Sequence, residues 1–203
     1  MHPILLDLDT PYVEAQTLLA LLRDYREPRS CIEHMVKKGD LIRLKNGFYL
    51  LGRTRQIPYE SIANLLYGPS YVSLEWALSF YGLIPERVMV VTSISTGRNK
   101  TFHTPIGAFI YRHAPLDRYC IGIDRKETKL GGFLMATPEK ALIDAIHFSC
   151  QGLNQTELFQ ELIESKRIEV EELKNLDKAL VFMIAKNYHS SVVKEFAEII
   201  GKL

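Results

Sequence analysis

The chain has 203 residues, 47% of them hydrophobic, and its 25 Lys and Arg side chains nearly balance 24 Asp and Glu side chains. It is long enough for one large or two modest domains, and its net charge of +1 excludes neither a nucleic-acid partner nor a protein partner. Three scattered cysteines argue against a disulfide framework and favour a reducing, cytoplasmic location. Neither a basic leader nor an apolar run of about 18 residues is present, so we expect no export signal and no membrane span.

The first elements are predicted to be two helices and a two-stranded ribbon. Apolar residues recur at helical spacing over 14–25, and Pro28 opens a second helix that Gly39 ends. Asn46 and Gly47 are the dipeptide of a tight hairpin, a turn that needs positive φ at both positions. Helix, helix and ribbon in this order predict a winged helix-turn-helix, in which the helix before the ribbon enters the major groove of DNA.

Local charge favours a DNA-binding role for this N-terminal domain, predicted over residues 1–57. From Arg23 to Arg55 the sequence has nine basic and four acidic residues, a surplus of +5 in a chain of +1. Basic residues that neutralise phosphates release condensed counterions and so bind nucleic acid. The alternative is a protein-binding module, because lysines on a surface helix often form only a solvated face.

Eight residues of this domain form the candidate DNA-binding site. Arg29 and Ser30 lie in the first turn of the second helix, where a recognition helix faces base edges, so we expect them to read sequence. His34 is one turn further along and is placed to reach the groove, although an exposed histidine is more often simply solvated. Four basic residues expected to contact phosphates and one turn residue complete the set: Lys37, Lys38, Arg43, Lys45 and Asn46. Solubility is the alternative role of each lysine, and turn geometry alone accounts for the asparagine.

The second domain, over residues 58–203, is predicted to be a mixed α+β unit. Two helices, over 59–66 and 72–82, precede five short strands rich in β-branched and aromatic residues, as in an antiparallel meander. The expected strands cover 87–95, 100–105, 107–113, 118–124 and 131–136.

Helices are predicted to complete the second domain. Thr137 as N-cap and Pro138 at the first helical position open a helix that closes a core over 58–150. A helical tail follows over 151–203, and the spacing of Asn154 and Glu157 predicts a capping box at its start.

The second domain has a basic surplus but no strong catalytic or metal-binding motif. Between Glu86 and Lys129 eight basic residues outnumber four acids, which is compatible with a face for RNA, for a toxin or for no partner. The basic residues are Arg87, Arg98, Lys100, Arg112, Arg118, Arg125, Lys126 and Lys129. Asp117, Asp124 and Lys126 loosely match the acid, acid-x-lysine arrangement of metal-dependent nucleases, a triplet that also occurs by chance. We therefore expect no enzymatic activity, no cofactor and no bound metal.

Four longer motifs are more specific than any single residue. In chain order they are LIRLKNGFYLL, YVSLEWALSFYGLIPE, TFHTPIGAFIYRH and MATPEKALIDAI. Together they closely resemble the bacterial abortive-infection AbiEi antitoxin family of transcriptional regulators. The resemblance covers about residues 18–150 and is weaker in the helical tail. The sequence departs from the common winged-helix pattern in one respect. Many winged helices have three helices before the wing, and here the first of them is either absent or replaced by the segment HPILLDL.

The resemblance implies a cytoplasmic antitoxin of a type IV toxin–antitoxin system that represses its own operon. Its winged helix would bind operator DNA as a monomer or weak dimer, cooperatively on repeated sites, and its second domain would counter a nucleotidyltransferase-like toxin without needing a stable complex. The first alternative is an antitoxin that binds protein or RNA and lacks sequence-specific DNA binding. A metal-dependent nuclease ranks below both.

Overall fold

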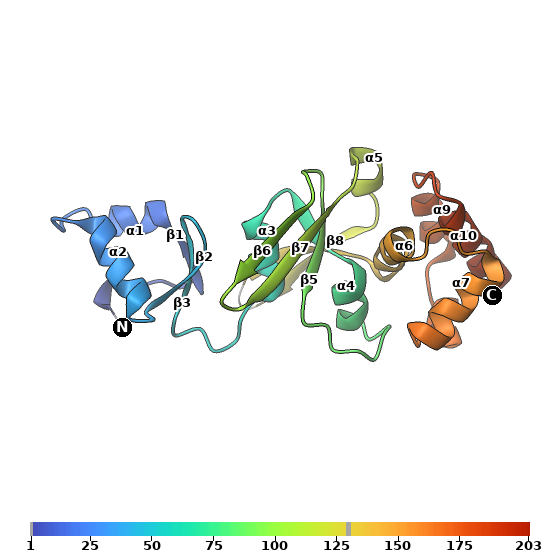
Figure 1. Ribbon diagram of the computed structural model, residues 1–203, viewed down its shortest axis with the longest axis horizontal. Helices are drawn as coiled ribbons and strands as arrows, with labels where there is room; N and C mark the ends of the chain where they lie inside the picture. Colours follow the sequence, from blue (N-terminus) through green and yellow to red (C-terminus); the bar gives the residue numbers. More distant parts are fainter. Residues whose placement is uncertain (1, 129–130) are drawn as a thin grey trace.

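The computed structural model describes residues 2–128 and 131–203, so Lys129, one of the basic residues counted above, lies outside the described residues. These residues form a mixed α+β protein. An N-terminal unit, a central sheet and a group of C-terminal helices follow one another along the long axis of the molecule (Figure 1).

The N-terminal unit combines short helices with a small antiparallel sheet of order β1-β3-β2. Its elements are η1, a 3-10 helix (Pro3–Leu5), β1 (Tyr12–Glu14), α1 (Ala15–Leu21), α2 (Pro28–Lys37), β2 (Leu41–Lys45) and β3 (Phe48–Leu51). The helix predicted over 14–25 is therefore shorter than expected, and the strand that precedes it was missed. Strand β1 forms because Val13 is buried in the core while its backbone pairs with β3. The segment HPILLDL supplies η1 in place of a longer first helix.

Gly39 ends α2 as the sequence predicted. Its φ of +76° lies in the left-handed region that favours glycine, and its N–H donates to the carbonyl of Val36 at 3.0 Å. The next N–H, from Asp40, donates to Met35 at 2.9 Å. These bonds satisfy the last carbonyls of the helix and turn the chain directly into β2.

The hairpin forms at Asn46 and Gly47, but its turn differs from the prediction. Positive φ was expected at both residues, whereas among the described non-glycine residues only Leu74 and Arg167 have it, so Gly47 alone has it in this turn. The pairing of β2 with β3 shifts between Arg43 and Lys45, which marks an irregularity of the bulge type. A bulge adds local twist, so the strands do not need the mirror-image turn.

The second sheet has the order β6-β7-β5-β4-β9-β8. Its strands are β4 (Ser70–Val72), β5 (Val91–Ser95), β6 (Lys100–Thr104), β7 (Gly107–His113), β8 (Ile123–Thr128) and β9 (Gly131–Ala136). The predicted antiparallel meander is wrong, because β5 and β7 are parallel, as are β4 and β9. The expected strand over 118–124 is also wrong, since helix α5 (Leu116–Tyr119) occupies its first part.

Burial explains why β7, and not β6, pairs with β5. Strand β7 carries Phe109 and Tyr111, which are fully buried and need neighbours on both sides. Strand β6 is mostly polar, with Lys100, Thr101 and His103 exposed, and it takes the edge of the sheet. A meander predicted from chain order alone would place β6 next to β5, whereas β7 lies between them.

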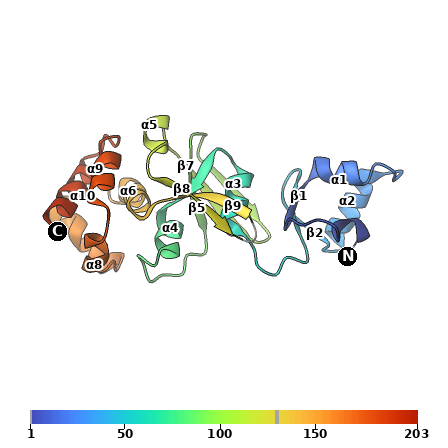
Figure 2. The ribbon, with the colours of Figure 1, turned by 180° about the vertical axis from the view of Figure 1, so that it is seen from behind.

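Helices cover both faces of the second sheet. They are α3 (Tyr59–Leu66), α4 (Leu74–Phe80) and α6 (Pro138–Ser149), with α3 beside β9 in the rear view (Figure 2). Tyr71 pairs with Ile94 and Tyr111 with the adjacent Ser93, so the two tyrosines point to opposite faces. The Tyr111 hydroxyl donates to a carbonyl of α3, and the Tyr71 hydroxyl donates to Asp144 of α6, so these helices lie on opposite faces.

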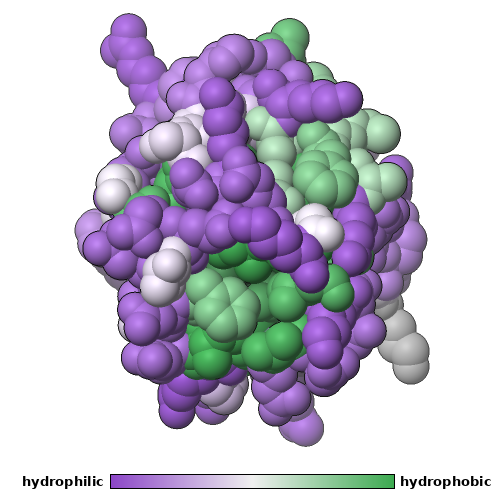
Figure 3. Space-filling view, turned by 90° about the vertical axis from the view of Figure 1, so that its right-hand side faces the viewer, coloured by the Kyte–Doolittle hydropathy of each residue, from purple (hydrophilic) through white to green (hydrophobic). Residues whose placement is uncertain are grey.

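The tail is helical, as predicted. Its elements are α7 (Gln155–Gln160), η2, a π-helix (Glu161–Ser165), α8 (Val170–Lys174), α9 (Lys178–Ala185) and α10 (Ser191–Lys202). The N-cap at Thr137 and the capping box of Asn154 and Glu157 are confirmed. The end of the molecule that these helices form shows apolar areas inside a hydrophilic rim (Figure 3), and Phe182 and Met183 of α9 are 42% and 53% exposed.

A buried polar cluster joins α6 to the sheet and to the tail. Lys140 and Asp144 are both buried, with 3.5 Å between Nζ and Oδ1. Tyr188, which follows α9, accepts a hydrogen bond from Lys140 and donates one to Asp144. Ser73 and Tyr71 donate to the other carboxylate oxygen at 2.7 and 3.1 Å. Burial lowers the pKa of Lys140, and the carboxylate of Asp144 opposes that shift.

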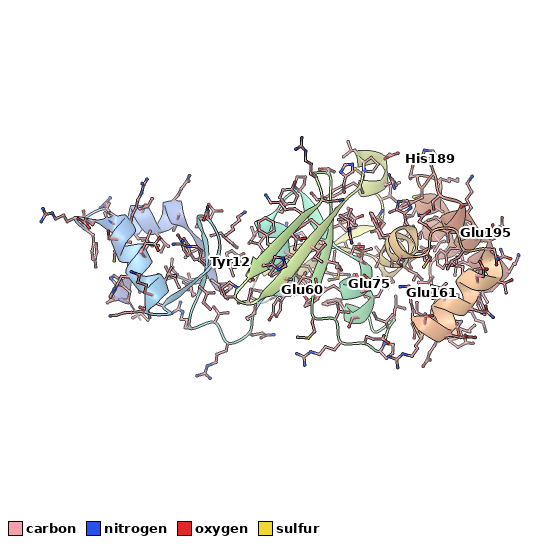
Figure 4. All side chains as sticks on the ribbon, viewed as in Figure 1. Tyr12, Glu60, Glu75, Glu161, His189 and Glu195 are labelled. Carbon is pink, nitrogen blue, oxygen red and sulfur yellow. The ribbon has the colours of Figure 1, made fainter. Side chains whose placement is uncertain are left out.

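Strand β3 belongs to two hydrophobic cores. Tyr49 and Leu51 point into the N-terminal core, against α1 and α2, whereas Phe48 and Leu50 join the core of the second sheet. The ring of Tyr12 packs against that of Phe48 in a tilted arrangement, with 5.7 Å between the ring centroids, and Tyr12 lies between the two units (Figure 4). The hairpin is therefore packed on both faces.

Candidate nucleic-acid interface

Helix α2 presents one buried and one exposed side. Ile32 and Met35 are buried against the N-terminal core, which fixes the helix on the small sheet. The exposed side chains form two rows at i, i+4 spacing: Arg29, Glu33 and Lys37 in one, and Ser30, His34 and Lys38 in the other. Five of the eight predicted site residues therefore lie together on a single helix face.

Most of this face has no partner within the protein. Among the described residues no hydrogen bond or ion pair engages the side chains of Arg29, His34, Lys37 or Lys38. Ser30 is different, because its hydroxyl donates to a carboxylate oxygen of Glu27 at 3.1 Å. Three uncompensated cations and one imidazole are available to an outside ligand.

Arg43 lies beside this face but is already paired. Its guanidinium forms an ion pair with Glu33 and stacks at 5.8 Å over the ring of Tyr49. The hydrogen bond that Arg43 donates to Glu33 raises the pKa of Arg43, and partial burial opposes this shift. The pair neutralises Glu33, the one acidic residue within Pro28–Lys37, so Arg43 increases the positive character of the face without needing to contact phosphate itself.

Lys45 points away from α2. Its Nζ atom donates to the carbonyl oxygens of Leu65 and Leu66, at 3.1 and 2.7 Å, at the C-terminal end of α3. A cation there is stabilised by the helix dipole. Burial lowers the pKa of Lys45, with Glu14 opposing and Lys100 reinforcing the shift. Asn46 is exposed at the hairpin tip.

The junction between the two units was not foreseen. The run Phe48–Leu51 is apolar at every position and buried at every position, the pattern of a strand covered on both faces. A strand with one solvated face would alternate instead. That run was the signal in the sequence that β3 has two neighbours.

The nuclease-like triplet does not gather into a metal site. Lys126 forms an ion pair with Asp124 at 3.1 Å on the edge strand β8, and Asp117 accepts a hydrogen bond from the N–H of Arg118. Within residues 2–128 and 131–203 no group of three His, Cys, Asp or Glu side chains is arranged to hold a metal ion. The described pockets are lined by residues other than Asp117, Asp124 and Lys126.

The chain is a mixed α+β protein with an exposed, basic helix in its N-terminal unit. In the described parts of the chain no helix has the length and apolarity needed to cross a membrane. Comparison with protein-family models gives no match, and comparison with curated proteins gives none.

Proposed function

We propose that the protein is a DNA-binding transcriptional regulator whose N-terminal unit is a winged helix-turn-helix with α2 as the reading helix. The order 3-10 helix, strand, helix, helix, hairpin, with the third strand between the other two, is compatible with that class. The observation that carries the proposal is the unpartnered basic face of α2. An α-helix with its side chains is about 10–12 Å in diameter, which fits a major groove about 12 Å wide. The 10 residues of α2 give a helix about 15 Å long.

The candidate residues divide into two roles in this proposal. Arg29 and Ser30 lie in the first turn of α2 and read base edges, with His34 one turn behind. Lys37 and Lys38 end the helix and contact phosphates. Lys45 contributes through the junction with α3 rather than at the tip of a free wing.

The further part of the proposal is an antitoxin role in an abortive-infection operon. It is supported by the four motifs that resemble the AbiEi family. The protein represses its own operon in the cytoplasm, and its second domain counters a nucleotidyltransferase-like toxin. Co-expression with the adjacent gene tests this role: growth is expected to be restored by the intact chain and to stay restored when α2 is mutated.

A fluorescence-anisotropy titration tests DNA binding. The probe is labelled DNA from upstream of the protein's own gene, with a scrambled duplex for comparison. Wild type is expected to prefer the upstream DNA, and the Arg29→Ala, Lys37→Ala variant to lose that preference. Lys178→Ala removes an exposed cation of α9 and is the matched control. Equal affinity of wild type for both duplexes would overturn sequence-specific binding and favour a protein- or RNA-binding antitoxin.

A further inference from the structure

Helix α10 has a buried side and an exposed ridge. The buried side packs on α6, α7 and α9, which fixes the helix in the tail, at the opposite end of the molecule from the N-terminal unit (Figure 1). We define the α10 ridge as four exposed residues of this helix: Ser191, Lys194, Glu198 and Gly201. Their spacing of three or four residues places them in one line along the helix.

The two charges of the ridge are not neutralised within the protein. Lys194 and Glu198 are one turn apart, yet among the described residues no ion pair includes either of them and no hydrogen bond engages the ammonium group of Lys194. Glu198 accepts a hydrogen bond from the neutral amide of Gln155 at 3.1 Å, which leaves its negative charge uncompensated. The ridge therefore offers one cation and one anion to an outside partner.

Apolar surface lies beside the C-terminal end of the ridge. A Cβ atom at Gly201 would lie 3.4 Å from the ring of Phe182, so α9 brings this ring to the side of the ridge. The ring is exposed, and so is the next residue, Met183. Figure 3 shows this end of the molecule with apolar areas inside a hydrophilic rim. Contact with another molecule would remove this apolar surface from water, which is favourable.

The order of residues along the ridge is its own complement. It reads small residue, cation, anion, small residue. When a second copy of the ridge runs antiparallel to the first, Lys194 of each copy lies opposite Glu198 of the other. In the same register Ser191 lies opposite Gly201, and both are small enough for the two helices to approach closely. A twofold interface has this property, because one patch supplies both of its sides.

Charge complementarity decides which occupant the ridge fits. A partner of a single sign, such as a nucleic acid, would neutralise Lys194 and repel Glu198. A second copy of the ridge neutralises both, and it does so twice because the two pairs are related by symmetry.

We propose that the α10 ridge is a self-association surface through which two copies of this chain form a dimer with antiparallel α10 helices. Phe182, beside Gly201, packs on the first turn of α10 in the other copy. Specific interfaces at the small end of the range, about 1,200 Å² in total, usually belong to transient complexes, so one helix pair with flanking rings gives a reversible dimer. The dimer does not depend on the proposed function, since two copies can associate whether or not DNA is bound. Both α2 faces stay free, because α2 and the ridge lie at opposite ends of the molecule (Figure 1).

Sedimentation velocity at a series of protein concentrations tests for this dimer. Wild type is expected to shift from monomer to dimer as the concentration rises. Lys194→Glu places carboxylates opposite each other at both pairs, and Glu198→Lys does the same with ammonium groups. Each single variant is expected to raise the dissociation constant by about tenfold, because two attractive pairs become repulsive. Arg26→Glu makes the same change of charge on an exposed residue of the N-terminal unit and is the control, with the wild-type dissociation constant expected.

An exchange of the two charges separates pairing between copies from a general effect of charge. The double variant Lys194→Glu, Glu198→Lys restores both pairs, so its dissociation constant is expected to return to the wild-type value. An equimolar mixture of the two single variants is expected to form a mixed dimer more tightly than either variant associates with itself, because each carboxylate then faces an ammonium group. A misfolded variant would not regain association on mixing, so the mixture also checks folding.

Three results would each overturn the proposed dimer. Wild type that stays monomeric at millimolar concentration would exclude a second copy as the occupant and make a different protein the partner to seek. Single variants that associate as wild type does would place any self-association surface elsewhere on the molecule. A double variant as weak as the single ones, with no gain on mixing, would exclude the pairing of Lys194 with Glu198 between copies.

Discussion

The ammonium group of Lys45 lies 2.7 Å from the carbonyl oxygen of Leu66, the last residue of α3. This contact ties the hairpin of the N-terminal unit to the first helix of the second. The sequence predicted that Lys45 lies near the tip of a wing and contacts phosphate. In the structure its side chain forms hydrogen bonds between the two units.

Lys45→Ala is expected to lower the free energy of unfolding by about 1 kcal/mol, because hydrogen bonds from a cation to helix carbonyls are lost. Urea denaturation measures the change. Lys38→Ala removes an exposed lysine with no such contact and is expected to leave stability unchanged. An effect no larger than that of Lys38→Ala would show that the junction bond adds nothing to stability.

Phe48→Ala is expected to cost about 3–5 kcal/mol, the usual range for truncating a buried aromatic ring. Phe48 belongs to the core of the second sheet although it lies on an N-terminal strand. Scanning calorimetry should resolve one transition in wild type and two in the variant. Leu18→Ala truncates the N-terminal core alone and should lower the transition temperature without splitting the peak. A single, unsplit peak for Phe48→Ala would argue against a junction that joins the two cores.

Single substitutions on α2 should separate base reading from backbone binding. Arg29→Ala is expected to cost about 1–3 kcal/mol on upstream DNA and little on scrambled DNA. Lys37→Ala is expected to weaken both alike and to lower the salt slope by about 0.9. Anisotropy titrations at several salt concentrations measure both quantities. If both variants change the two duplexes equally, α2 binds DNA without reading it.

Lys140→Met is expected to cost about 3–5 kcal/mol, because it leaves the buried carboxylate of Asp144 without its cation. The double variant Lys140→Met, Asp144→Leu removes both charges and should cost less than the sum of the two single changes. Urea denaturation of the three variants gives the comparison. Strict additivity would mean that the two side chains do not interact.

Protonation of His147 should make the protein less stable in mild acid. Burial lowers the pKa of His147, and Arg118, whose Nη1 atom lies 2.7 Å from the ring nitrogen Nε2, lowers it further. Lys140 acts in the same direction and Asp144 opposes it. The unfolded chain takes up this proton near its ordinary pKa of about 6.5, before the folded chain does. Stability from this group is therefore complete above about pH 6.5 and is lost as the pH falls below that value.

Denaturation midpoints between pH 5 and 8 measure this loss, with His147→Gln as the comparison. The variant is expected to show a flatter pH profile. An identical profile in both proteins would assign the acid sensitivity to other groups.

Local elements were largely predictable from the sequence. Gly39 ends α2, Thr137 caps α6, and Asn154 with Glu157 forms the capping box, because each depends on a few neighbouring residues. The face of α2 was predictable for the same reason, since helical spacing alone sets it. The parallel pairing of β4 with β9 and of β5 with β7 could not be predicted, because it joins residues far apart in the chain.

Lys140 and Asp144 show most clearly what could not be predicted from the sequence. A lysine and an aspartate four residues apart on a helix ordinarily indicate an exposed face. Helix α6 packs against α4, α9 and α10 as well as the sheet, so it has no exposed face at this point. Only the tertiary arrangement decides that the pair is buried and which tyrosines satisfy it.

Strand β3, buried by both units, has a thermodynamic consequence. A partner that binds the second domain and shifts β3 also shifts α2, because Phe48 and Leu50 of this strand pack in one core and Tyr49 and Leu51 pack in the other. Linkage then requires reciprocity: the factor by which that partner changes affinity for DNA equals the factor by which DNA changes affinity for the partner. The fraction of operator DNA bound by the protein would then depend on whether a partner is bound to the second domain.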